Sequence, residues 1–182
     1  MIPVKVIKIS YHPTSRSYAV ILKEITGKKC LPVIVGSFEA QSIALAIELV
    51  DTPRPLTHDL ICDVITGIDS LLKTVRINSL EDGVFYAQME IESERLGDRI
   101  IDARPSDAIA VALRMNTPIF VSSKVLKEAG VTENSLTNNE PKEKTSTISL
   151  KTLKEKLKNA IEEEDYEIAA KLRDRISDLE SS

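Results

Sequence analysis

Aromatic residues and excess positive charge are both scarce in this 182-residue sequence. It contains no Trp, three Phe and four Tyr, and its formal net charge at pH 7 is -4. Binding of single strands by base stacking needs aromatic side chains, and broad non-specific binding of nucleic acid needs a basic face. The composition argues against both modes. It does not exclude phosphodiester hydrolysis, because metal-assisted hydrolysis needs only clustered carboxylates where the phosphate binds.

Other absences exclude further classes of protein. No apolar run reaches the roughly 18 residues that a membrane-spanning helix needs, so no membrane partner is expected. The N-terminal MIPVKVIKIS alternates like a strand and lacks a signal-peptide cleavage site, so we expect a cytoplasmic location. Cys30 and Cys62 have no CxxC or Cys/His spacing, which favours reduced core thiols. The sequence also lacks an HxH or HExxH run that would mark a metal site.

The chain divides into a domain, a linker and an appendage. Residues 1–131 have the length and composition of one globular domain. Residues 132–147 contain a single large apolar residue, which cannot offset the entropy of ordering, so they are predicted to be a flexible linker. Residues 148–182 carry two apolar stripes at helical spacing, which predict a helical hairpin: Leu150, Leu153, Leu157 and Ile161, then Ile168, Leu172, Ile176 and Leu179. This hairpin is too small to bury its stripes alone, so we expect it to dock onto a partner, another copy of itself or the main domain.

The periodicity of the first 131 residues predicts an α+β fold, with a mixed or antiparallel sheet and alanine-rich packed helices. Strands are expected at residues 4–10, 18–25, 31–35, 71–78, 84–92, 99–102 and 118–121. Helices are expected at 38–49, from an N-cap at Thr57 to near Gly67, from Pro105 to Met115, and at 123–129. The apolar face of the second helix is assigned to Leu60, Ile61, Val64 and Ile65. The alanine-rich helices also suggest a homodimer or larger homo-oligomer.

Two charged corners precede predicted helices. In the 102–107 corner, DARPSD, Pro105 suits the first helical position and Asp107 offers a carboxylate to the positive end of the helix dipole. In the 54–59 corner, RPLTHD, the helix start disfavours a charged His58, which leaves a neutral imidazole able to act as base or ligand. Both corners also have a structural interpretation, in which the carboxylates cap helices and the arginines are their ion-pair partners.

Four segments of the first domain resemble the bifunctional nuclease (BFN) family: LPVIVGSFEAQSIA (31–44), RPLTHDL (54–60), DGVFYAQM (82–89) and IDARPSDAIAVALR (101–114). The tail segment LKNAIEEEDYEIAAKLRDRISDLE (157–180) resembles the UVR motif of UvrB and UvrC, a helical-hairpin interaction module. These resemblances imply an α+β nuclease acting on DNA or RNA, with a tail that binds a protein partner. The alternative is a non-catalytic regulatory or scaffold protein that recruits a DNA-repair or Clp-system partner through the hairpin.

Under the nuclease hypothesis, the two corners converge on one phosphodiester-hydrolysing pocket. The chemistry needs an acid or base, phosphate-binding cations and a divalent ion, expected to be Mg or Mn. The predicted catalytic residues are His58, Asp59, Asp102 and Asp107. The predicted substrate-binding residues are Arg54, Arg104 and Ser106, and the predicted metal ligands are Asp59, Asp102, Asp107 and Glu39.

Overall fold

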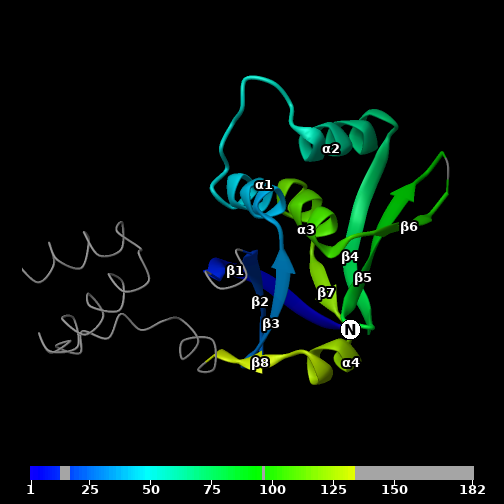
Figure 1. The fold of residues 1–182 in the computed structure, drawn as a ribbon. Coiled ribbons are helices and arrows are strands. Elements are labelled where there is room, and N and C mark those ends of the chain that lie inside the picture. Colours follow the sequence, from blue (N-terminus) through cyan, green and yellow to red (C-terminus); the bar gives the residue numbers. More distant parts are fainter. Residues whose placement is uncertain (13–16, 96, 134–182) are drawn as a thin grey trace, which may run out of the picture. The chain divides into compact units, whose positions relative to one another are not determined.

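The computed structural model describes residues 1–12, 17–95 and 97–133, which form a mixed sheet and four helices (Figure 1). The eight strands lie in the order β6-β5-β4-β7-β1-β2-β3-β8. Only the β4–β7 pair is parallel in this sheet. The strands are β1 Ile2–His12, β2 Ser17–Glu24, β3 Lys29–Val35, β4 Ser70–Glu81, β5 Val84–Ser93, β6 Arg99–Ala103, β7 Ile119–Val121 and β8 Val131–Thr132. The helices are α1 Ser37–Ile47, α2 Thr57–Gly67, α3 Pro105–Arg114 and α4 Ser123–Glu128.

The predicted α+β class is confirmed for this part of the chain, and each of the seven expected strands is present. The turn between β4 and β5 has Asp82 at φ 50° and Gly83 at φ 80°, the left-handed conformations that a tight hairpin requires. Strand β8 was not predicted, because two residues show no periodicity. Its residues Val131 and Thr132 pair with Cys30 and Lys29, so the sheet includes the first residue of the predicted linker.

Several helix ends differ from the prediction by one or two residues, and two of these differences have a clear physical cause. Thr57 is not an N-cap: Leu56 holds that position, and Thr57 is the first residue of α2. The Leu56 N–H donates to Asp59 Oδ2 at 2.8 Å, so the Asp59 carboxylate satisfies the amide of the cap residue. Helix α1 ends at Ile47, two residues early, and Leu49 then adopts a left-handed φ of 51° that no helix can continue through.

The predicted apolar face of α2 is half confirmed. Ile65 is buried and Ile61 is partly buried against the core, whereas Leu60 and Val64 are 57% and 53% exposed. Helix α2 packs onto α3 and β4 along one side only, so the rest of its apolar surface faces outward. Periodicity identified an apolar helix, but it did not show how much of that helix is covered.

Helix α3 is the most deeply buried element, and it contacts α1, α2, β4 and β5. The run Ala108, Ile109, Ala110, Val111 and Ala112 is at most 1% exposed. Figure 1 shows α3 beside α1 and α2 at one end of the sheet, with α4 and β8 at the other end. Small alanine side chains let neighbouring helices approach closely, so packing fixes the position of α3.

The remainder of the chain lies beyond this region. Residues 134–182 include most of the predicted linker and the whole predicted hairpin, and both fall outside the described residues. No helix within the described ranges has the length and apolarity needed to cross a membrane.

The burial of α3 generates a stability prediction. Ile109→Ala removes a fully enclosed side chain from the core, so we expect the free energy of unfolding to fall by about 2–5 kcal/mol. Leu71→Ala on β4 is the matched control, since Leu71 is 59% exposed and its truncation should change stability by no more than about 0.5 kcal/mol. Urea unfolding followed by circular dichroism measures both variants. Equal losses in the two would contradict the assignment of α3 as the core helix.

Candidate active site

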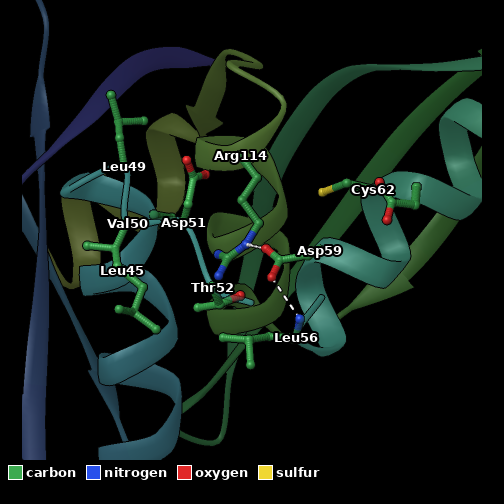
Figure 2. A pocket seen from close by; sticks show the side chains of 11 residues that line it. Leu45, Leu49, Val50, Asp51, Thr52, Leu56, Asp59, Cys62 and Arg114 are labelled. Carbon is green, nitrogen blue, oxygen red and sulfur yellow. Dashed lines mark hydrogen bonds and ion pairs between the residues drawn. The ribbon is translucent and has the colours of Figure 1, made fainter. Parts of the chain in front are cut away.

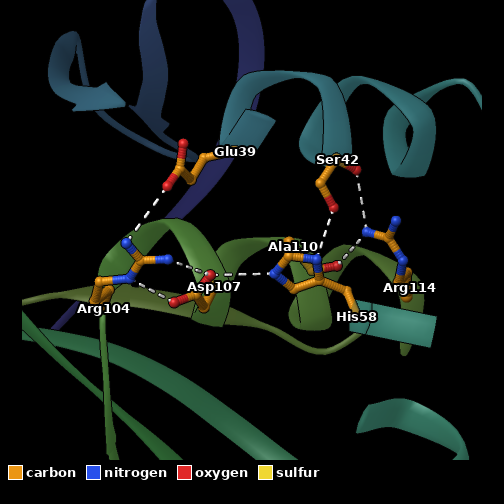
Figure 3. A network of polar contacts seen from close by, with 7 residues as sticks. All are labelled: Glu39, Ser42, His58, Arg104, Asp107, Ala110 and Arg114. Atoms are coloured by element: carbon orange, nitrogen blue, oxygen red, sulfur yellow. Dashed lines mark hydrogen bonds and ion pairs between the residues drawn. The ribbon is translucent and has the colours of Figure 1, made fainter. Parts of the chain in front are cut away.

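A network of polar side chains joins α1, α2 and α3 at the buried face between them (Figure 3). Its centre is His58, near the start of α2, whose side chain is 14% exposed. The imidazole contacts Ser42 on α1 and Asp107 on α3. The two charged corners therefore meet, as predicted, through the contact between His58 and Asp107.

Both ring nitrogens of His58 have partners. Its Nε2 lies 3.2 Å from Asp107 Oδ1, and its Nδ1 lies 2.8 Å from Ser42 Oγ. An ionised carboxylate only accepts hydrogen bonds, so Nε2 carries the proton that faces Asp107. In the neutral imidazole Nδ1 then accepts from the Ser42 hydroxyl. The two contacts thus select one tautomer and hold the ring in place.

Arg104 covers the solvent side of Asp107. Its Nε donates to Asp107 Oδ2 at 2.8 Å and its Nη2 donates to Oδ1 at 3.2 Å, while Nη1 lies 3.4 Å from Glu39 Oε1. Burial acts to raise the pKa of Asp107, but the hydrogen bonds from Arg104 and His58 outweigh it and hold that pKa below its usual range. The Arg104 side chain is 68% exposed. A charged, accessible guanidinium therefore stands next to an ionised carboxylate.

Asp59 does not contact the His58–Asp107 pair but binds Arg114, the last residue of α3, which meets the same network at the carbonyl of Ser42. Arg114 Nε donates to Asp59 Oδ1 at 2.5 Å, and this bond, together with that from the Leu56 N–H, lowers the pKa of Asp59. The Arg114 side chain is only 11% exposed, and its Nη1 also donates to the carbonyls of Ser42 and Ala110. A pocket of about 300 Å³ opens beside this pair, lined by Leu45, Leu49 and other residues of α1, α2 and their connection (Figure 2).

Cys62 lies in the same pocket, and burial raises the pKa of its thiol. Cys30 is buried in β3 and its pKa is raised for the same reason. Both cysteines are free, as the sequence predicted. Protonated thiols in these places are poor nucleophiles.

The predicted site residues fall into three groups. His58, Asp107, Arg104 and Glu39 come together, with Ser106 next to Arg104 at the start of α3. Asp59 pairs with Arg114 and does not join the contact between His58 and Asp107. Arg54 and Asp102 join neither cluster: Arg54 is exposed before α2, and Asp102 is exposed on β6 opposite Gln88.

The four predicted metal ligands do not form a common binding site. Asp59 is paired with Arg114, while Asp107 and Glu39 both face Arg104. In the part of the chain that the structure describes, no group of three or more His, Cys, Asp or Glu side chains could hold a metal ion. The carboxylates present here are placed to bind arginine.

Sequence reasoning missed Ser42 and Arg114. Ser42 is three residues after Glu39, so the two share a face of α1, and this spacing was the available signal for Ser42. Arg114 lies in the last turn of α3 and has the position of an ordinary cation at a helix C-terminus. Nothing in the sequence paired it with Asp59, which lies 55 residues earlier.

The Asp59–Arg114 pair predicts an acid-sensitive stability. Asp59 has a lowered pKa, so its contribution is complete above the unfolded-state value of about 3.9 and is lost as pH falls through the folded-state pKa. At pH 7, Asp59→Asn should lower the free energy of unfolding by about 1–3 kcal/mol, because Arg114 stays enclosed without its counter-charge. Below that pH window the variant and the parent protein should have the same free energy of unfolding.

The control is Asp63→Asn, one turn later on α2, where the carboxylate is exposed. Urea unfolding between about pH 2 and pH 7 measures all three proteins. A difference between Asp59→Asn and the parent that stays constant across this range would contradict the assigned ion pair.

Comparison with known proteins identifies two regions of the chain. The bifunctional nuclease domain matches residues 20–134, and the UvrB/UvrC motif matches residues 147–182. An uncharacterized protein of Mycobacterium tuberculosis is 42% identical over 130 residues, which cover 70% of this chain and 76% of the relative.

Plant relatives are more distant. Bifunctional nuclease 1 of Oryza sativa subsp. japonica is 25% identical over 120 residues, covering 63% of this chain and 35% of the relative. Bifunctional nuclease 2 of Arabidopsis thaliana is 25% identical over 197 residues, covering 94% of this chain and 57% of the relative. The chain therefore belongs to the bifunctional nuclease domain family and carries a UvrB/UvrC motif after the family domain.

Proposed function

We propose that this chain is a nuclease that cleaves phosphodiester bonds in DNA or RNA at the network around His58 and Asp107. The observation that carries the proposal is the meeting of the two corners, with Nε2 of His58 3.2 Å from Asp107 Oδ1. An imidazole and an ionised carboxylate in hydrogen-bond contact form an acid–base pair. Membership of the bifunctional nuclease family supports the choice of substrate.

Arg104 is the proposed phosphate-binding residue. Its guanidinium already makes a two-point contact with a carboxylate, and phosphate oxygens present the same bidentate geometry. Because the side chain is 68% exposed, a phosphate group can reach it without opening the core. Phosphate binding would compete with Asp107 for Arg104 and would leave the carboxylate available to the reaction.

Asp107 is proposed to contact the attacking water, with His58 behind it. The Asp107 side chain is 31% exposed and that of His58 is 14% exposed, and both imidazole nitrogens are engaged within the protein. This changes the role expected for His58, from an acid or base to a group that orients Asp107. The Asp107 carboxylate takes the proton that the water loses, the Nε2–H of His58 keeps its hydrogen bond to Oδ1 and orients the carboxylate, and Ser42 holds the ring.

Dependence on a divalent cation is a separate prediction. Three of the four carboxylates expected to bind it, those of Asp59, Asp107 and Glu39, are paired with arginines. Adding Mg or Mn, or a chelator, to the assay described below measures this dependence independently of the role of the His58–Asp107 pair.

The nuclease proposal is tested by assaying highly purified full-length protein on single- and double-stranded DNA and RNA. His58→Ala and Asp107→Asn should each lower the rate by about 100-fold or more, as expected for loss of an acid–base group. Arg104→Lys should also lower the rate, because an ammonium group cannot reproduce the two-point contact. Thermal melts of each variant separate loss of rate from loss of folding.

Arg99→Lys is the matched control, since Arg99 on β6 donates only to the neighbouring Asp98 carbonyl in the described region. Its rate should equal that of the parent protein. Full activity in all three site variants would point to another site or a contaminant. Folded, inactive parent protein on every substrate would instead favour the regulatory or scaffold alternative.

We further propose that residues 148–182 bind a protein partner, with the UvrB/UvrC motif as support. A charge in an apolar stripe opposes burial of that stripe at an interface, so Leu172→Glu should abolish recruitment of a partner and leave nuclease activity intact. Lys171→Glu is the control, because Lys171 lies outside the predicted apolar stripes. It tests whether an added negative charge at any position abolishes recruitment of the partner. Identical pull-down profiles for parent and Leu172→Glu would reject the proposal.

A further inference from the structure

A pocket of about 360 Å³ opens at the start of α3, next to the His58–Asp107 pair. Its polar end is formed by Arg104, Pro105 and Ser106, and its apolar wall includes Ile34 at the end of β3 and Val84 and Phe85 at the start of β5. Arg104 belongs both to this pocket and to the network, so a ligand in the pocket would lie beside the proposed acid–base pair.

The start of α3 is open to an anion. Its N-cap residue Arg104 makes no side-chain cap hydrogen bond, and Pro105 at the first position has no N–H. The next two amides, of Ser106 and Asp107, have no carbonyl partner among the described residues. Free amides and the positive end of a helix dipole favour a bound anion.

Ser106 supplies the second, independent observation. The residue is only 8% exposed, and its hydroxyl has no hydrogen-bond partner within the described ranges. No fully enclosed side-chain oxygen in that region lacks a partner, so the Ser106 hydroxyl must reach open space, and the open space beside Ser106 is the pocket. A hydroxyl that reaches a pocket and has no protein partner is available to donate to a ligand there.

The apolar wall of the pocket can contact an apolar group attached to the anion. Ile34 and Val84 are 63% and 55% exposed, and they line the same pocket as the anion-binding groups. A ligand that joins an anionic group to a flat apolar group would contact both ends at once. A nucleoside phosphate has this chemistry, and the pocket volume lies in the range of small-molecule sites.

Glu39 is the one group in the pocket that opposes an anion. A Cβ built on Gly36 would lie 2.6 Å from Glu39 Oε2, so the Glu39 carboxylate lies directly against the backbone at the start of α1. It therefore covers that helix end and leaves the start of α3 as the anion site. Its contact with Arg104 is long, at 3.4 Å, and an incoming phosphate can replace it.

We propose that this pocket binds a nucleoside phosphate, with the phosphate at Arg104 and Ser106 and the base against Ile34, Val84 and Phe85. The inference deepens the proposed function and rests on it for the choice of nucleic acid as substrate. Binding itself needs no cleavage, so it is measured separately from activity. The ligand has two sources, a free mononucleotide or the phosphorylated end of a strand.

The test is calorimetric titration of the full-length protein with adenosine and cytidine 5′-monophosphates, the matching nucleosides and inorganic phosphate. We expect each monophosphate to bind at least about tenfold more tightly than its nucleoside or phosphate, since only it contacts both ends. Ser106→Ala should weaken monophosphate binding several-fold, and Ser70→Ala, at a serine on β4 that does not line the pocket, should leave it unchanged.

Further variants separate the two ends of the pocket. Val84→Ser and Ile34→Ser should weaken the monophosphate but not inorganic phosphate, and both positions are exposed enough to leave folding intact. Glu39→Gln should strengthen both ligands, because the opposing charge is removed. A tetranucleotide with a 5′-phosphate that displaces the monophosphate, where its 5′-hydroxyl counterpart does not, assigns the strand end as the source. If neither tetranucleotide displaces the monophosphate, the ligand of the pocket is the free mononucleotide.

Absence of monophosphate binding at millimolar concentration would overturn the inference, as would equal affinity in the parent, Ser106→Ala and Val84→Ser proteins. An active nuclease that binds no monophosphate would reject this pocket and leave the proposed function in place. A protein that binds monophosphates with the expected variant pattern but cleaves nothing would support the pocket and reject the nuclease.

Discussion

Burial of α3 between α1, α2 and the sheet is the constraint on which the candidate site depends. The five residues from Ala108 to Ala112 are at most 1% exposed, and three of them are alanines, whose small side chains allow close approach of α1 and α2. This packing fixes the start of α3, and with it Arg104, Ser106 and Asp107. A loop would not hold three such groups in constant geometry.

The charged groups around α3 contribute more to geometry than to stability. Arg104 is mostly exposed, so its pairs with Asp107 and Glu39 are screened by solvent and add little to folding. Arg114 is almost enclosed, so its charge must be compensated, and Asp59 and two backbone carbonyls do so. One arginine can thus be released to a ligand at small cost, whereas the other holds α1, α2 and α3 together.

The same distinction assigns different roles to the two corners. In the 54–59 corner, Asp59 faces inward to Arg114, and only His58 reaches the neighbouring corner. In the 102–107 corner, Arg104 faces solvent, Asp107 is partly buried behind it and Ser106 lines the pocket. The family relationship supports a nuclease. Among the predicted site residues, the best candidates are the side chains that a phosphate group can reach.

The sequence by itself determined the local structure and the family. The pattern of apolar residues placed seven strands, and Pro105 marked the first residue of α3. These features depend on neighbours within a few residues, so they can be predicted from spacing and backbone preference. The family motifs also lie in short continuous segments, and the comparison with known proteins confirmed both of them.

Only the tertiary structure decided which side chains meet. Ser42 and His58 are 16 residues apart, His58 and Asp107 are 49 apart, and Asp59 and Arg114 are 55 apart, so no local pattern encodes these contacts. The exposure of Leu60 and Val64 likewise depends on how much of α2 the rest of the domain covers. Helix packing brings distant groups together. Asp59 and Asp107 each lie in the first turn of a helix, but packing gives them different partners and different surroundings.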